Sequence, residues 1–328
     1  MAQKLHITTS PHVHCGDTIE RNMRWVIVAL MPALIASFIV FGLGSLIVTA
    51  TSVLSCLFFE WFITRVFLKR SSTLGDCSAA ITGILLAFNL PSNIPLYMIM
   101  VGALVAIGIG KMAFGGLGNN PFNPALVGRV FLLISFPAKM TSWPVPAGLA
   151  TSYVDAETGA TPLNLIGQIA GGNTAAADQL PGLGELFIGN IGGCIGEVNA
   201  LALLIGLLIL LWRKVITWHI PVTILATVAI LTGLMWLINP VLYVNPLYHL
   251  CSGGLMLGAI FMATDYVTSP MTAKGMVWYG IGIGFLTVII RYFGSYPEGM
   301  SFAILLMNAV TPLINNWCKP KRFGEAVK

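Results

Sequence analysis

Long apolar segments separated by short polar connections run through almost the whole chain. Ten of them predict helices, at residues 25–42, 45–64, 77–90, 95–114, 122–137, 187–212, 217–238, 248–264, 275–292 and 301–317. A membrane-spanning helix needs about 20 predominantly apolar residues, and most of these segments approach that length. The third and eighth are short and rich in small residues, which favours helices packed inside a bundle or broken part-way. The pattern predicts an all-α polytopic membrane protein with about ten transmembrane helices.

Composition supports a membrane protein and excludes several other classes. The chain has 328 residues, of which 56% are hydrophobic and 9% are charged, whereas a soluble domain has about 25% charged residues. The net charge of +5 comes from basic residues in short scattered groups, which argues against a nucleic-acid interface. The six cysteines include no CxxC pair, so the sequence predicts no local iron–sulfur or zinc site.

The positions of the cations predict the orientation in the membrane. If the chain crosses ten times, almost all Lys and Arg residues fall on one side, and only Lys139 and Arg291 lie towards the other. Arg129 lies inside the fifth segment. Cytoplasmic connections are enriched in Lys and Arg, so both termini are expected in the cytoplasm of a bacterial cell, with the protein in its inner membrane.

The two halves of the chain resemble each other weakly. The third segment, SAAITGILLAFNLPS, and the eighth, CSGGLMLGAIFMATDYVTSP, share small residues and a polar end followed by Pro. Five crossings per half would give the halves opposite orientations, as in inverted-repeat transporters. We therefore expect a first repeat within residues 1–137, an outer loop at 138–184, and a second repeat with a cytoplasmic tail at 185–328.

A short motif in the outer loop carries the most specific chemistry. Residues 155–161 read DAETGAT, a small and pliable segment that ends in the hydroxyl of Thr161. A modifying enzyme could bind this segment as an extended peptide and reach that hydroxyl. The carboxylates of Asp155 and Glu157 could assist a metal ion during the transfer, because hard cations prefer oxygen ligands.

The motif matches the D-x-x-T-G-A-T string at which a flavin transferase attaches FMN, through its phosphate, to the last threonine. Two further strings, GKMAFGGLGNNPFNPALVGRVF (110–131) and GNIGGCIGEVNALALLIG (189–206), accompany it. With them the chain resembles the NqrB/RnfD family of respiratory membrane subunits over nearly its whole length. It is closer to the RnfD members, because NqrB carries a longer N-terminal part. Cys194 stands where the family usually has a serine.

The resemblance implies a urea-channel-like scaffold with FMN bound covalently to Thr161. Asp155, Thr158, Gly159 and Ala160 would form the rest of the flavinylation motif. It also implies a second, non-covalent riboflavin among the helices. The expected partners are Rnf subunits A, B, C, E and G, a flavin transferase of the ApbE type, and membrane lipid. Such a subunit passes electrons within a complex that couples ferredoxin and NAD⁺ to Na⁺ or H⁺ movement, and it is not catalytic alone.

An ion path would use polar groups inside the helices, where charges are costly unless they face partners or water. The candidates are Glu197, Glu60, Asp265, Asn89 and Asn123. Two other functions stay open on the sequence. The chain could be a channel or transporter for a small polar solute without a redox role, or an inactive assembly scaffold.

Overall fold

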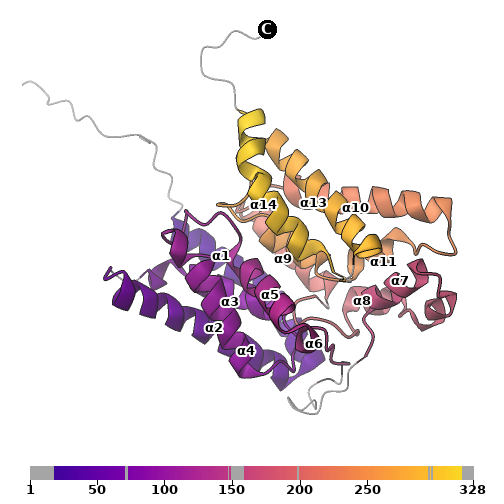
Figure 1. Cartoon of the computed structure of the whole chain (residues 1–328), viewed down its shortest axis with the longest axis horizontal. Helices are drawn as coiled ribbons and strands as arrows, with labels where there is room; N and C mark the ends of the chain where they lie inside the picture. The colour runs from indigo at the N-terminus through magenta and orange to yellow at the C-terminus, as the bar shows by residue number, and fades with distance from the viewer. Residues whose placement is uncertain are drawn as a thin grey trace, which may run out of the picture.

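The computed structural model describes residues 18–70, 73–146, 148, 159–197, 199–294, 296 and 298–319. Within this part the chain is an all-helical bundle, drawn in Figure 1. Its first half contains α1 (Ile19–Phe41), α2 (Leu43–Phe62), η1 (Ile63–Phe67), η2 (Leu74–Asp76), α3 (Ser78–Phe88), α4 (Leu96–Leu104), η3 (Val105–Ile109), η4 (Met112–Phe114), α5 (Pro124–Ser135) and α6 (Pro137–Met140).

The second half follows three short helices, α7 (Pro162–Ala170), η6 (Thr174–Gln179) and α8 (Leu183–Ile188). It contains α9 (Ala200–Trp212), α10 (His219–Ile238), α11 (Pro246–Cys251), α12 (Leu255–Leu257), η7 (Gly258–Met262), α13 (Ala273–Phe293) and α14 (Met300–Trp317). The described chain begins and ends at one end of the bundle, and α6, α7 and α8 lie at the opposite end (Figure 1).

Every apolar segment predicted from the sequence contains helix, but two helix predictions need correction. The predicted helix 187–212 is wrong over 189–197 and at 199, which are irregular and lie between α8 and α9. The predicted helix 248–264 is interrupted at residues 252–254, between α11 and α12. The predicted loop 138–184 contains α7 and η6, and α7 buries Leu165 and Ile169. Apolar content alone did not distinguish buried irregular backbone from helix.

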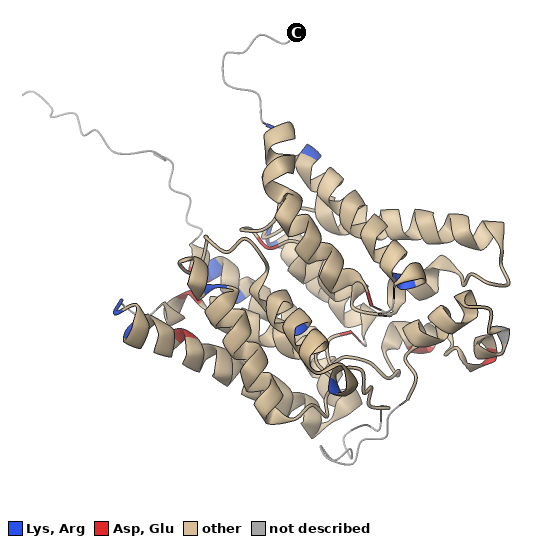
Figure 2. Cartoon of the chain, viewed as in Figure 1, with Lys and Arg blue, Asp and Glu red and all other residues tan. Residues whose placement is uncertain are grey.

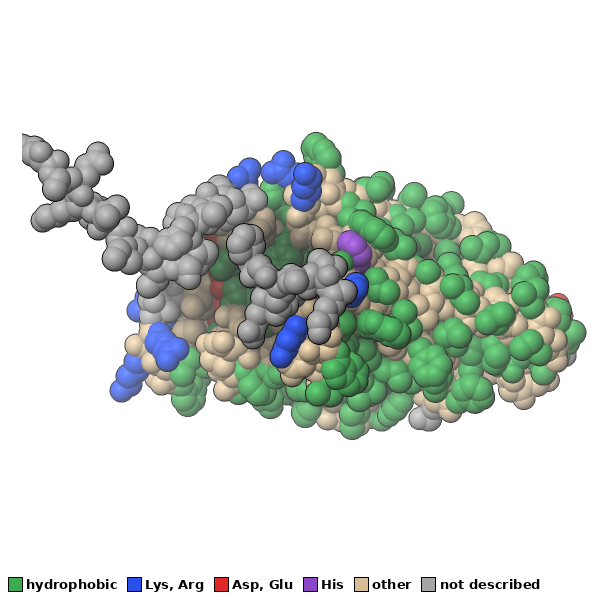
Figure 3. Space-filling model, turned by 90° about the horizontal axis from the view of Figure 1, so that it is seen from above, with side chains coloured by type: hydrophobic (Ala, Val, Ile, Leu, Met, Phe, Trp, Pro, Cys, Tyr) green, Lys and Arg blue, Asp and Glu red, His purple; other side chains and the backbone are tan. Residues whose placement is uncertain are grey.

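The apolar surface identifies the protein as membrane-integral. Among the described residues, five helical stretches are long and apolar enough to cross a bilayer: Ile19–Phe41, Leu43–Phe67, Leu96–Phe114, His219–Ile238 and Ala273–Phe293. Large apolar side chains such as Leu208 and Ile230 are more than half exposed, and hydrophobic side chains cover much of the surface in Figure 3. Lys and Arg lie mostly towards the end where α1 begins and α14 ends (Figure 2).

The short helix α3 ends inside the bundle. Almost every residue of α3 is buried, and the helix stops at Asn89. Its last carbonyls are satisfied by the irregular segment between α8 and α9, in which Gly196 N donates to Phe88 O at 2.9 Å and Ile195 N donates to Leu90 O at 3.1 Å. A Cβ on Gly196 would lie 2.3 Å from Phe88 Cβ. This close backbone contact supplies the hydrogen bonds that lipid cannot.

Polar caps fix where several helices start. Asn123, Thr161 and Asn245 are each followed by Pro, and each side chain accepts a backbone N–H of the first helical turn. Proline at the first helical position has no N–H that would need a partner. These caps place Asn123 and Thr161 at the starts of α5 and α7, at opposite ends of the bundle (Figure 1).

Because α2 packs closely against α3, we expect that adding one methyl group at Gly83 destabilises the protein. A Cβ on Gly83 would lie 2.7 Å from Val53 Cα, so Gly83→Ala should lower the free energy of unfolding in detergent by about 1–3 kcal/mol. Gly167→Ala is the control, because a Cβ there meets nothing within 4 Å. Equal thermal stability of the two variants would contradict this packing.

Candidate functional site

The last residue of the predicted flavinylation motif is the N-cap of helix α7. Thr161 caps the helix, and its Oγ1 accepts the N–H of Asn164 at 3.2 Å. The residue is only 4% exposed. Gly159 N donates to Trp143 O at 2.9 Å, and Ala160 is exposed. Asp155 and Thr158, which the sequence assigns to the same motif, lie outside the described residues.

A buried ion pair lies at the centre of the bundle. Arg129 of α5 places Nη2 2.7 Å from Glu298 Oε2, and the two side chains are 6% and 11% exposed. Its Nη1 donates to Asn89 Oδ1 at 2.7 Å and to Ser301 Oγ at 2.6 Å. Glu298 also accepts the backbone N–H of Gly254. One guanidinium therefore binds groups from both halves of the chain.

This network joins the points at which both short helices break. Asn89 is the residue after α3, and Gly254 is the residue before α12. A helix C-terminus carries partial negative charge and a helix N-terminus partial positive charge. The cation Arg129 therefore lies at the end of α3, and the anion Glu298 lies at the start of α12. Arg129 and Glu298 therefore compensate the partial charges of these helix ends as well as each other's charge.

The predicted ion-path residues Asn89 and Glu197 belong to this central region. Glu197 is 8% exposed and lies in the irregular segment between α8 and α9, three residues after Cys194. Cys194 is also buried, and its Sγ donates to Asn89 O at 3.4 Å. The thiol thus makes a hydrogen bond of the kind that the expected serine could make.

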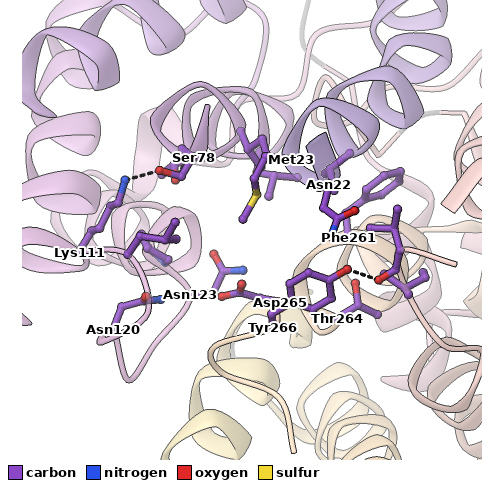
Figure 4. Close-up of a pocket in the computed structure, with 18 of the residues that line it drawn as sticks. Asn22, Met23, Ser78, Lys111, Asn120, Asn123, Phe261, Thr264, Asp265 and Tyr266 are labelled. Atoms are coloured by element: carbon purple, nitrogen blue, oxygen red, sulfur yellow. Dashed lines mark hydrogen bonds between the residues drawn. The ribbon is translucent and has the colours of Figure 1, made fainter. Parts of the chain in front are cut away.

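A pocket lined by residues of both chain halves lies beside the starts of α3 and α5 (Figure 4). Its floor includes Leu85, one helical turn before Asn89, and Asn123, six residues before Arg129 in α5. A rise of about 1.5 Å per residue separates Asn123 and Arg129 by about 9 Å along the helix. Its polar lining residues are Asn22, Ser78, Thr82, Lys111, Asn120, Asn123, Thr264, Asp265 and Tyr266, and its apolar ones include Met23, Ile81 and Phe261.

Both chain halves form the pocket walls. Asn123 Nδ2 donates to Met262 O at 3.1 Å, which joins the start of α5 to the end of η7. Figure 4 shows the side chains of Asn123 and Asp265 close together. Asp265 follows η7 outside the helices, and burial raises the pKa of its carboxyl, while hydrogen bonds from Val267, Thr268 and Tyr266 oppose that rise.

Glu60 is neutralised by a lysine on the wall of this pocket. Lys111 Nζ lies 2.6 Å from Glu60 Oε2, and both side chains are almost fully buried. Lys111 also donates to Ser78 Oγ at 2.5 Å (Figure 4), and Ser78 donates to Asp76 at 2.5 Å. Thr73 donates to the other oxygen of Glu60 at 2.6 Å. The hydrogen-bonded chain runs from the half-exposed Asp76 to the pocket wall.

The structure therefore divides the predicted ion-path residues into two groups. Asn89 and Glu197 lie in the central network, whereas Asn123, Asp265 and, through Lys111, Glu60 lie at the pocket. Sequence reasoning missed Glu298, which lies in a connection, and it placed Lys111 among the surface cations. No local pattern distinguishes either residue, because their partners come from helices distant in sequence.

Removing one charge of the central pair should destabilise the protein. Arg129→Met leaves the Glu298 carboxylate buried without its ion-pair partner, and it should lower the free energy of unfolding by about 3–5 kcal/mol. The double variant Arg129→Met/Glu298→Met should recover most of that loss in a double-mutant cycle. Lys274→Met, at an exposed position, is the control. A single Arg129→Met variant as stable as the native protein would show that the pair contributes nothing.

Comparison with known proteins identifies the family. The model of the NQR2, RnfD, RnfE family matches residues 6–324. The chain is 46% identical to the D subunit of the Na⁺-translocating ferredoxin:NAD⁺ oxidoreductase complex of Acetobacterium woodii, over 98% of this chain and 95% of the relative. It is 42% identical to the D subunit of the proton-translocating ferredoxin:NAD⁺ oxidoreductase complex of Clostridium ljungdahlii, over 97% and 96%. It is 38% identical to the D subunit of the ion-translocating oxidoreductase complex of Yersinia pseudotuberculosis, over 98% and 99%. The chain belongs to the NQR2, RnfD, RnfE family.

Proposed function

We propose that this chain is the RnfD-type subunit of a complex that couples electron flow between ferredoxin and NAD⁺ to ion translocation. The support is similarity along nearly the full length of relatives that are named for this role. One of these relatives is named for Na⁺ and another for protons, so the family assignment leaves the coupling ion as Na⁺ or H⁺. The subunit acts within the complex, with other Rnf subunits as partners.

The observation that carries the redox role is the position of Thr161. It lies at the end of the bundle opposite to the described chain ends, away from most Lys and Arg residues (Figures 1 and 2). We place this end outside the cytoplasm, with both termini in the cytoplasm and the protein in the inner membrane. FMN attached to Thr161 by a flavin transferase would then face the outer compartment and could not be lost by dissociation.

We place the second, non-covalent flavin in the pocket between the halves. Ligand pockets combine an apolar lining with a few placed polar groups. The pocket at Asn123 has both features. The amides of Asn120 and Asn123 could pair with the polar edge of an isoalloxazine, and Phe261 and Ile81 offer apolar contact. We assign riboflavin to this pocket.

The chain's own residues hold the two flavin positions apart. A flavin, when bound, accepts or donates one or two electrons. Arg129, Glu298 and Asn89 fill the space between the pocket and the opposite end with a tightly paired polar network. Such a packed centre argues against the alternative function, an open path for a small polar solute.

The ion path would use the polar groups beside the pocket, Asp265 and Asn123, and beyond them Glu197.

The arrangement of helices favours ten crossings in two inverted repeats. In the first half α2 packs along α3 and α4, and in the second α10 packs along α13 and against η7. The broken helices α3 and α12–η7 occupy corresponding places, and α5 contacts α14 across the middle. Short helices inside protein need no full-length apolar run, because neighbouring groups satisfy their ends.

Loss of the acceptor hydroxyl should abolish covalent flavin. With a flavin transferase co-expressed, Thr161→Ala should give no fluorescent band on a denaturing gel, because alanine cannot form a phosphoester. Thr161→Ser should keep the band, and Thr141→Ala, at an exposed threonine of the same outer region, is the control. A fluorescent Thr161→Ala band would show that FMN is attached to another residue.

Filling the pocket should release the second flavin alone. Ile81→Trp places a large side chain in the pocket lining and should lower the acid-extractable flavin per polypeptide while the fluorescent band at Thr161 persists. Leu208→Trp, on an exposed face, should leave both flavins in place. If extractable flavin is unchanged in a folded Ile81→Trp protein, riboflavin binds elsewhere.

A further inference from the structure

The hydroxyl of Thr161, the proposed acceptor of FMN, is inaccessible in the folded subunit. Thr161 is 4% exposed, and its Oγ1 already accepts the N–H of Asn164 at 3.2 Å. Pro162 and Leu163, which follow it, are buried as well. A nucleophile and the atom that it attacks must approach to about 3–3.5 Å in line with the leaving group. A buried capping hydroxyl offers no such approach to a phosphorus atom held by another protein.

The packing of α7 keeps the hydroxyl in this position. One face of the helix buries Leu165 and Ile169, which form a small apolar cluster with Ala176, and Leu180 and Val244 pack against it. The opposite face exposes Asn164, Gly167 and Gln168. The cluster is separate from the main core of the bundle, and α7 in addition buries Leu163 and Ile166 and contacts α13. A small separate cluster can open while the rest of the protein stays folded.

The residues before Thr161 are also held. Gly159 donates its N–H to Trp143 O at 2.9 Å, and a Cβ on Gly159 would lie 2.9 Å from Val145 Cγ2. An enzyme that binds the motif as an extended peptide has to break the bond to Trp143 and unwind the first turn of α7. Both ends of the described part of the motif, Gly159 and Thr161, are thus engaged within the subunit.

We propose that Thr161 is a substrate for flavin transfer only while α7 is unseated, so that FMN is attached before α7 packs onto the bundle. This inference rests on the proposed function of Thr161. In the reaction, Thr161 Oγ1 attacks the flavin-side phosphorus of a flavin dinucleotide and forms a new O–P bond. The bond from that phosphorus to the bridging oxygen breaks, AMP leaves with that oxygen, and the hydroxyl proton passes to a base of the transferase. No electrons are exchanged.

The order of events can be tested on the full-length subunit purified without flavin. Transferase, FAD and Mg²⁺ are added, and the initial rate of covalent fluorescence is compared between variants. Ile169→Ala removes apolar contact from the α7 cluster, eight residues beyond Thr161 and outside the motif. Because it makes opening easier, it should raise the rate about tenfold or more. Gln168→Ala, on the exposed face of the same helix, should label at the native rate.

A second measurement protects the test against a misfolded variant. Hydrogen exchange at the Asn164 and Leu165 amides should be faster in Ile169→Ala than in the native protein, while the amides of α10 and α13 keep their protection. Leu165→Ala, in the same cluster, should reproduce the increase in labelling.

The possible results separate this inference from the proposed function. Equal labelling rates for the native protein, Ile169→Ala and Gln168→Ala, with α7 exchange faster in Ile169→Ala, would overturn the proposed order of events and leave Thr161 as the acceptor. If no protein is labelled, in vitro or in cells that co-express the transferase, the FMN site itself is wrong. Faster labelling confined to the variants with a loosened α7 supports the inference.

Discussion

A guanidinium buried in a membrane protein needs a counter-ion and hydrogen-bond acceptors, and here Arg129 obtains them from both halves of the chain. Glu298 supplies the charge, and Asn89 and Ser301 supply oxygens. Because charged groups without partners are very costly away from water, this network fixes where α3 ends, where α12 begins and how α5 lies between them.

The broken helices of the bundle are covered by other parts of the chain. Broken helices expose backbone groups that lipid cannot satisfy, so they occur where protein or water covers them. In this bundle the irregular segment around Gly196 covers the end of α3, and Glu298 caps the start of α12. The centre is thereby filled with paired polar groups. The proposed flavin positions lie at its two sides, one in a pocket and one on a small separable helix.

The small helix α7 differs from the rest of the bundle in how it is held. Leu165 and Ile169 of α7 lie in a small apolar cluster with Ala176, whereas most buried apolar residues of the membrane helices share one continuous core. A segment held this way can fold last, so the proposed acceptor Thr161, which caps α7, would be accessible before the helix packs. The stability of the main bundle then does not depend on whether the modification has taken place.

The sequence by itself determined the membrane class, the positions of the helical segments, the motif at Thr161 and the family resemblance. These follow from apolar runs, caps and a short contiguous string, all of which are local. It could not show that Glu60 is neutralised by Lys111, that Arg129 pairs with Glu298, or that Asn123 and Asp265 line one pocket. Nor could it show that the Thr161 hydroxyl is buried. Each of these depends on which distant segments pack together, and close packing in the folded bundle decides that.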